Sequence, residues 1–228
     1  MHRRSDSSAT RTNRRQFLKT AGAVSATALT APTIIPRTAL SAPGRPGAND
    51  RITVGAIGVG GRAGLLLDQL PESAQIVALS DCNLPRAEAF KAKAKADWPV
   101  YQDYHKLLER KDVDAVIVAT GEFQRVVPCI HACQAGKDVY AEKPLTLYVG
   151  EGRALVDAVR RHDRIFQVGT QQRSMEMNRV ACELIRSGGL GKVLAVRAIN
   201  YSGAEASPNA GLPEQPTPDG LDWNTWLN

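Results

Sequence analysis

Short apolar runs alternate with segments whose apolar residues recur at helical spacing, from about residue 52 to residue 187. Most of the short runs are bounded by Gly, Pro, Asn or Asp, as is typical of strands, and the longer segments match amphipathic helices. The pattern predicts strands at residues 52–57, 75–80, 100–101, 115–119, 139–141 and 165–168. It predicts helices at residues 62–70, 85–96, 104–110, 126–135, 147–162 and 177–187.

The predicted strand at residues 115–119 reads AVIVA, with no polar alternation. Such a run is expected for a strand that is covered on both faces, as in a parallel sheet between two layers of helices. Strands that alternate with helices are joined by right-handed crossovers, which place helices on both faces of one sheet. We therefore predict an α/β protein with a doubly wound parallel sheet, the Rossmann arrangement.

The regular alternation stops near residue 200. Residues 193–199 (VLAVRAI) predict one more strand, and four prolines follow in an irregular stretch. We interpret residues 51–175 as one domain and residues 176–228 as only the start of a second, truncated domain. The strand at 193–199 has an apolar face without partner strands, so we expect its edge to favour self-association. A second copy of the chain, in a homo-oligomer, is therefore one candidate partner.

The formal net charge of +6 lies entirely in the first 41 residues, which hold seven basic residues and one acidic residue. The rest of the chain carries equal numbers of basic and acidic side chains. A basic face that could bind nucleic acid is therefore not expected, and we predict no nucleic-acid partner.

The basic leader contains the pair Arg14-Arg15, followed by a mild apolar run at residues 21–31. The run is too short to span a membrane, and the layout resembles a twin-arginine export signal; the alternative is a disordered basic tail. We predict a signal peptide at residues 1–41 and a linker at 42–50. The expected partner is the twin-arginine export machinery, and the expected location is periplasmic or extracellular.

A glycine-rich turn at residues 58–63 (GVGGRA) fits the G-x-G-x-x-G/A fingerprint of dinucleotide-binding domains. It directly follows a predicted strand and opens a helix, as that chemistry requires: Gly58 allows a tight turn, Gly60 lets a pyrophosphate approach the backbone, and Ala63 lets the helix pack on the strand. The residues that we assign to the cofactor at this turn are Ile57, Gly58, Gly60, Gly61 and Arg62.

Asp81 ends the second predicted strand, 23 residues after Gly58. A carboxylate at that position can accept hydrogen bonds from the adenosine ribose hydroxyls and would repel a 2′-phosphate. We therefore predict NAD as the cofactor, with NADP less favoured. The alternative is an ordinary glycine-rich turn beside a surface aspartate.

Polar residues follow the fourth and fifth predicted strands, at Thr120 and at Glu142-Lys143-Pro144. The carboxyl ends of parallel strands meet at one edge of the sheet, where ligands of doubly wound folds bind. We assign Thr120, Glu142 and Lys143 to the cofactor site as well. Lys143 is also the candidate catalytic residue, because a lysine there can donate hydrogen bonds or relay a proton. The alternative is a surface lysine at a strand end.

The four cysteines include no Cys-x-x-Cys pair, and no histidine pair has metal-ligand spacing, so we predict no metal site. Cys129 and Cys133 are four residues apart and share a helix face. We interpret them as small buried side chains rather than as a disulfide.

Several stretches together, including VGAIGVGGRAG, VDAVIVAT and CQAGKDVYAEKPLTL, resemble the glucose-fructose oxidoreductase / inositol dehydrogenase / MocA (Gfo/Idh/MocA) family over residues 51–228. The resemblance implies a nicotinamide-binding Rossmann domain, here residues 51–175, followed by an α/β domain with a large open sheet, of which residues 176–228 are the start. In that second domain, the predicted strand at 193–199 resembles the first strand and residues 221–227 resemble an early loop. It implies oxidation or reduction of a sugar, cyclitol or related polyol. It also places Lys143 beside the nicotinamide and the substrate hydroxyl, with a Lys143–Pro144 peptide that is often cis.

The chain departs from this family in two ways. Residues 121–125 read GEFQR where relatives often have a Pro-Asp-His-x-His-like turn, and the family's usual acid/base histidine lies in the second domain. The four histidines are His2, His105, His131 and His162, and none is well placed to act as an acid or base. Three hypotheses follow. The first is an exported NAD-dependent oxidoreductase, either with this chain as one part of it or with its missing half supplied from elsewhere. The second is a truncated dinucleotide-binding module with little or no turnover, and the third is a cofactor-free interaction fragment, which the intact fingerprint argues against.

Overall fold

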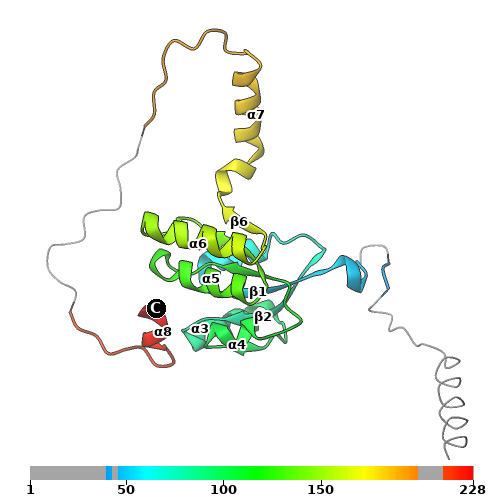
Figure 1. Cartoon of the computed structure of the whole chain (residues 1–228), viewed down its shortest axis with the longest axis vertical. Helices are drawn as coiled ribbons and strands as arrows, with labels where there is room; N and C mark the ends of the chain where they lie inside the picture. The colour runs from blue at the N-terminus through cyan, green and yellow to red at the C-terminus, as the bar shows by residue number, and fades with distance from the viewer. Residues whose placement is uncertain (1–39, 43–45, 200–212, 228) are drawn as a thin grey trace, which may run out of the picture.

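Six parallel strands form one sheet in the order β3-β2-β1-β4-β5-β6 (Figure 1). The computed structural model describes residues 40–42, 46–199 and 213–227. The strands are β1 (Ile52–Ile57), β2 (Ala74–Ser80), β3 (Val100–Tyr101), β4 (Ala115–Val118), β5 (Asp138–Glu142) and β6 (Phe166–Gly169). The order reverses between β1 and β4, which is the switch point of a doubly wound fold.

Helices connect successive strands of the sheet, as the sequence predicts. They are α2 (Gly61–Leu67), α3 (Leu84–Ala94), α4 (Tyr104–Leu108), α5 (Val126–Gln134) and α6 (Val149–Arg161). Two further helices, α7 (Glu176–Arg186) and α8 (Trp223–Leu227), come after the last strand. Short 3-10 turns occur at η2 (Ala48–Asp50), η3 (Glu122–Gln124) and η4 (Gln171–Ser174). The prediction of a doubly wound parallel sheet is confirmed, and six of the seven predicted strands and all six predicted helices lie within a few residues of an observed element.

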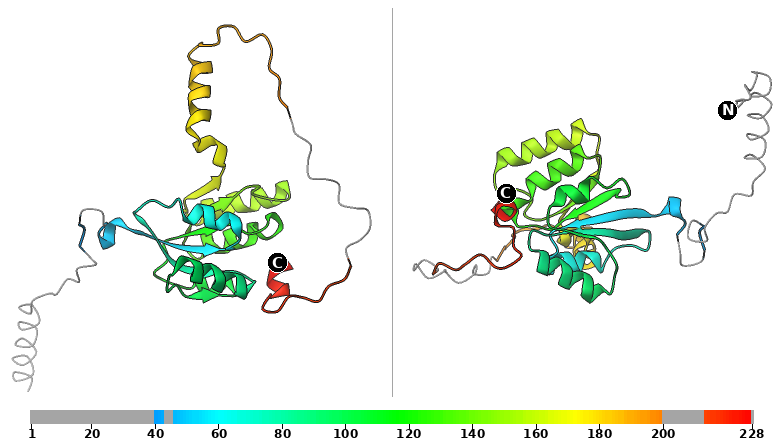
Figure 2. Two further views of the ribbon diagram at one scale, coloured as in Figure 1. Left: turned by 180° about the vertical axis from the view of Figure 1, so that it is seen from behind. Right: turned by 90° about the horizontal axis from the view of Figure 1, so that it is seen from below.

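Two apolar cores lie on opposite faces of the sheet (Figure 2). On one face, Leu107 of α4, Cys129 of α5 and Leu155 of α6 pack against strand residues such as Val116. On the other face, helices α2 and α3 pack against β1 and β2. Strand β4 contributes to both cores, which explains why residues 115–119 show no polar alternation.

Local capping explains where helix α3 begins and ends. The side chain of Asn83 accepts a hydrogen bond from Arg86 N at 3.0 Å, and Pro85 lies in the first turn, where its missing N–H has no cost. At the other end, Lys95 has a left-handed backbone with φ 52°. Helix α3 therefore starts at Leu84, three residues after Asp81.

The strand predicted at residues 193–199 is wrong, because the described residues there form no strand. Val193, Leu194, Val196 and Ile199 are all exposed. A strand is stable when a neighbouring strand satisfies its backbone N–H and C=O groups, and no described strand lies beside this segment. Its apolar alternation alone was not sufficient to form one.

Helices α7 and α8 differ in how they relate to the sheet (Figure 1). Every side chain of α7 is exposed, and this helix projects away from the body. In contrast, α8 lies against the body, because Asp222 N donates to Cys82 O at 2.9 Å and Leu221 forms an antiparallel bridge with Asn83. The segment that the sequence suggested as an early loop of a second domain thus contains a helix docked on the first.

The leader predicted at residues 1–41, with its Arg14-Arg15 pair, lies almost wholly outside the described residues. Within the described part, no helix has the length and apolar character needed to cross a bilayer. The four cysteines are all free, and Cys129 and Cys133 are buried, as predicted.

Candidate functional site

The glycine-rich turn joins β1 to α2 at the carboxyl edge of the sheet. Gly58 has φ 80°, and a Cβ atom there would lie 2.9 Å from Thr120 N, so a side chain is excluded by backbone conformation and by space. At Gly60 and Gly61, a Cβ atom would meet nothing within 4 Å. The first glycine is therefore required by the fold, whereas the other two leave an open approach to the backbone.

Asp81 lies directly beside this turn and is 5% exposed. Its Oδ2 accepts a hydrogen bond from Val59 N at 2.9 Å, and its Oδ1 accepts one from Asn83 N at 2.9 Å. Arg86 Nη1 lies 3.8 Å from Oδ2. The carboxylate thus holds the glycine-rich turn against the start of α3, and Asp81 also lines a pocket.

One pocket brings together five of the residues assigned from sequence: Ile57, Gly58, Gly60, Asp81 and Thr120. Other residues line the same pocket and were not predicted, among them Cys82, Arg86, Gln102, Tyr104, Gln124, Thr225 and Trp226. Gly61 lines a neighbouring groove together with Gly60 and Arg86. The pocket therefore lies at the switch point between β1 and β4, where ligands of doubly wound folds bind.

The other three assigned residues form a separate group at the end of β5. Arg62 Nε and Nη2 both lie close to Glu142 Oε1, at 2.8 and 2.7 Å. Glu142 Oε2 accepts a hydrogen bond from Lys143 N at 3.0 Å, and Glu142 is buried while Lys143 is exposed. The Lys143–Pro144 peptide is cis. Glu142 thus orients the lysine corner and ties it to the first turn of α2.

Arg125 is a site residue whose role the sequence did not reveal. Its guanidinium donates hydrogen bonds to the carbonyl oxygens of Thr120 and Pro144, so it joins the loops that follow β4 and β5. The residue is 3% exposed, and burial lowers the pKa of its guanidinium. Among the buried side-chain nitrogen and oxygen atoms of the described residues, Arg125 Nε is the one that has no hydrogen-bond partner. The GEFQR loop therefore has a structural link to the lysine corner that needs no histidine.

Burial changes the acidity of two pocket residues. It raises the pKa of the Cys82 thiol to about 11, with the neighbouring Asp81 carboxylate adding to the effect. It also raises the pKa of the Tyr104 hydroxyl to about 12, with Asp103 as the second cause. Both groups therefore stay protonated near neutral pH, and neither supplies a nucleophile or base to the pocket.

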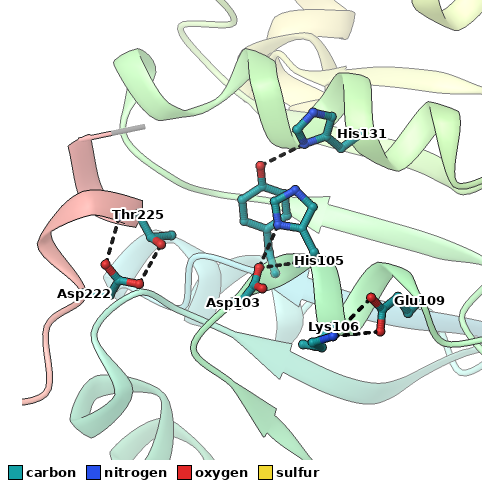
Figure 3. Close-up of polar contacts among 8 residues, drawn as sticks. Asp103, His105, Lys106, Glu109, His131, Asp222 and Thr225 are labelled. Atoms are coloured by element: carbon teal, nitrogen blue, oxygen red, sulfur yellow. Dashed lines mark hydrogen bonds and ion pairs between the residues drawn. The ribbon is translucent and has the colours of Figure 1, made fainter.

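His105 of α4 and His131 of α5 lie near each other, with ring centroids 5.0 Å apart (Figure 3). Tyr104 Oη lies 2.9 Å from His131 Nδ1, and His105 Nδ1 lies 2.7 Å from Asp103 Oδ1. Burial lowers the pKa of His131, and the nearby His105 lowers it further. No histidine lines the pocket itself, and the described residues contain no group of three potential metal ligands.

Comparisons with known proteins agree with this architecture. Residues 52–170 match the family model described as "Oxidoreductase family, NAD-binding Rossmann fold", and residues 11–31 match the model of a twin-arginine translocation signal sequence. Inositol 2-dehydrogenase of Pseudomonas fluorescens is 34% identical over 140 residues, which are 61% of this chain and 40% of that protein. The 2,7-anhydro-N-acetylneuraminate hydratase of Mediterraneibacter gnavus is 33% identical over 137 residues, or 60% of this chain and 36% of that protein.

A solved structure shows the same fold. Scyllo-inositol dehydrogenase from Lactobacillus casei, with bound NAD(H) and scyllo-inositol, superposes with a TM-score of 0.57 at 22% identity, over 62% of this chain and 42% of that one. The chain thus spans about four tenths of the length of these relatives. Since the family model covers more than half of the chain, from β1 to the residue after β6, this protein belongs to the Gfo/Idh/MocA oxidoreductase family, and its matched domain is an NAD-binding Rossmann fold.

Proposed function

We propose that this protein is an NAD-dependent oxidoreductase that acts on a sugar, cyclitol or related polyol by hydride transfer. The observation that carries the proposal is the pocket in which Gly58, Gly60, Asp81 and Thr120 meet at the switch point of the sheet. Asp81 and the open backbone at Gly60 have the chemistry that an adenosine ribose and a pyrophosphate require. The polyol class is supported by the inositol dehydrogenases among the relatives.

Lys143 is the proposed catalytic residue. When bound, NAD supplies the hydride acceptor, and the protein must hold the alcohol and take up its hydroxyl proton. Lys143 follows β5 at the carboxyl edge, is exposed, and is held in place through its backbone by Glu142. Its side-chain amine, in the neutral form, is proposed to contact the substrate hydroxyl and to take up the hydroxyl proton, becoming the ammonium as the hydride leaves the carbon.

The proposed location is the periplasm or the extracellular space. The match of residues 11–31 to a twin-arginine signal supports export across the membrane. This route carries folded proteins, which suits a protein that binds its cofactor before it leaves the cytoplasm.

A second candidate function is a dinucleotide-binding module that shows no turnover as a 228-residue chain. Two observations favour it: no histidine lines the pocket, and the matched relatives are more than twice as long as the part of them that this chain covers. Hydride transfer from an alcohol needs a walled substrate site and a base in addition to the nicotinamide.

Titration of the purified chain with NADH, followed by an assay of polyol-dependent NADH formation, separates these candidates. The oxidoreductase proposal expects NADH binding and turnover of at least one member of an inositol and sugar panel, abolished by Lys143→Ala with NADH binding retained. Binding without turnover on any member supports the module. Absence of NADH binding would contradict both candidates.

A further inference from the structure

The segment from Gly220 to Trp226, here called the C-terminal strap, is anchored to the loop after β2. Leu84 N donates to Gly220 O at 3.1 Å, and Asp222 N donates to Cys82 O at 2.9 Å. Gln102 Nε2 lies within hydrogen-bond distance of the Gly220 and Cys82 carbonyl oxygens, at 2.9 and 3.1 Å. Gly220 itself has φ 78°, and a Cβ atom there would lie 2.6 Å from Pro85 Cδ. The strap is therefore a fitted connection and not a loose tail.

The helical end of the strap is held from a second direction, by the loop after β4. Gln124 Nε2 donates a hydrogen bond to Trp226 O, and the rings of Phe123 and Trp226 meet edge to face with centroids 5.2 Å apart. Asp222 caps the helix, since Thr225 N and Oγ1 lie 3.0 and 2.8 Å from its two carboxylate oxygens (Figure 3). The strap therefore bridges the ends of β2 and β4.

This bridge crosses the pocket on the side away from the lysine corner. Thr225 and Trp226 line the pocket together with Gly58, Gly60 and Asp81. Lys143 and Glu142 do not line it. In a Rossmann domain, the acidic residue after the second strand binds the adenosine ribose, so the adenine lies beyond that residue. The strap thus covers the adenosine side.

The chemistry of the strap suits a purine. The half-buried indole of Trp226 stacks on Trp223 with ring centroids 4.8 Å apart, and the flat apolar surface that lines the pocket is one on which a base can stack. The Thr225 hydroxyl donates its proton to Asp222 Oδ2 and is therefore an acceptor beside the indole. The same pocket is also lined by two small residues, Ala119 and Gly121, and by the ring of Pro128. Such a lining leaves room for a planar aromatic ring, and the one carboxylate of the strap, Asp222, is bonded to Thr225 and does not line the pocket.

We infer that the C-terminal strap forms the wall that recognises the adenine of the dinucleotide, with Trp226 and Thr225 as positioning and specificity-determining residues. This inference rests on the proposed cofactor binding, and it specifies that the strap contacts the adenosine half of the cofactor. Trp226 contacts the base, and Gln102 and Gln124 act through the strap by holding it in place.

Calorimetric titration of the 228-residue chain with ADP-ribose, NADH and reduced nicotinamide mononucleotide tests this inference. For Trp226→Ala, we expect the affinities for ADP-ribose and NADH to fall by the same factor, about tenfold or more, the range of stacking on a base. The affinity for the mononucleotide, which lacks adenine, should stay unchanged. Thr225→Val should give a smaller loss with the same ligand selectivity.

The matched control is Leu227→Ala, because Leu227 lies on the same helix, is exposed and does not line the pocket. Gln102→Ala is the second variant: it weakens the anchor without changing the indole, and it should lower the affinities for ADP-ribose and NADH together while the affinity for the mononucleotide stays unchanged. Unchanged or increased ADP-ribose affinity in Trp226→Ala, or equal losses for all three ligands, would overturn the inference. If the unaltered chain binds none of the ligands, the proposed cofactor binding fails first, and the two failures are distinguishable.

Discussion

Arg62 and Glu142 form an ion pair between two turns that lie 80 residues apart in the chain. Two nitrogens of the guanidinium approach one carboxylate oxygen at 2.8 and 2.7 Å, and the Glu142 side chain is only 3% exposed. The same carboxylate accepts the Lys143 backbone N–H through its other oxygen. One glutamate therefore fixes the distance between the glycine-rich turn and the lysine corner.

Replacing Glu142 tests this connection. In Glu142→Ala, three charge-assisted contacts are lost, and we expect the free energy of unfolding to fall by about 2 kcal/mol. Urea unfolding followed by circular dichroism measures the change. The matched control is Glu109→Ala, which removes an exposed partner of Lys106 and should cost less than about 0.5 kcal/mol. Equal losses in the two variants would contradict the structural role of Glu142.

The glycines of the turn should separate folding from binding. Gly58→Ala places a Cβ atom 2.9 Å from Thr120 N at φ 80°, so we expect a loss of stability of about 1–3 kcal/mol. Gly60→Ala has open space at Cβ and should leave thermal unfolding unchanged while weakening NADH binding, because the methyl group occupies the approach to the backbone. Thermal unfolding with and without NADH measures both effects. Equal stability of the two variants would show that Gly58 is not required by the fold.

Cofactor choice should depend on Asp81. We expect the chain to bind NADH more tightly than NADPH, and Asp81→Ala to weaken NADH binding by about 1.5–3 kcal/mol, the worth of hydrogen bonds to a charged group. Asp81→Asn is the better-matched variant, because it keeps an acceptor for Val59 N while removing the charge. It should narrow the preference for NADH over NADPH, as measured by fluorescence titration. Equal affinities of the unaltered chain for the two cofactors would show that Asp81 does not face the ribose.

Stability should depend on pH through His131. Burial and His105 lower the pKa of His131 below its ordinary value of 6.5, so the unfolded chain takes up a proton more readily than the folded one. Its contribution to stability is therefore complete above pH 6.5 and is lost as the pH falls toward the folded pKa. We expect the midpoint temperature of thermal unfolding to decrease as the pH is lowered from 7.5 to 5.5. In His131→Gln, the midpoint temperature should change less over the same pH range. Equal changes in the two proteins would contradict a buried neutral imidazole.

Export should depend on Arg14-Arg15. A fusion of the leader to a reporter is expected to reach the periplasm, and replacement of both arginines by lysine should keep it in the cytoplasm, as shown by cell fractionation. The match of residues 11–31 to a twin-arginine signal supports this expectation. Unchanged delivery by the lysine variant would indicate another route.

Local sequence patterns predicted the sheet and one wall of the pocket, because both depend on neighbours in the chain. The glycine-rich turn follows directly from residues 58–63, and Asp81 follows from its place at the end of β2. In contrast, Arg125 acts by linking two loops that only the tertiary fold brings together, and nothing in its neighbourhood distinguishes it. A surface signal did exist for the strap, the two tryptophans at 223 and 226, but their partner loop lies about a hundred residues earlier.

The strand predicted at 193–199 shows that a local pattern can also predict an element that does not form. Apolar alternation describes what a strand would bury if a partner were present, but it does not supply the partner. The same holds for α7, whose exposed Met177, Val180, Leu184 and Ile185 give it an apolar side that no described residue covers. Burial depends on the surrounding chain, which the local pattern does not contain.

The position of the C-terminal strap also has a consequence for the timing of synthesis. During translation, the glycine-rich turn leaves the ribosome long before Thr225 and Trp226 do. The nascent chain can therefore complete its sheet while one wall of the pocket is still missing, and that wall is added only after residues 220–226 have emerged and docked on the loops that follow β2 and β4.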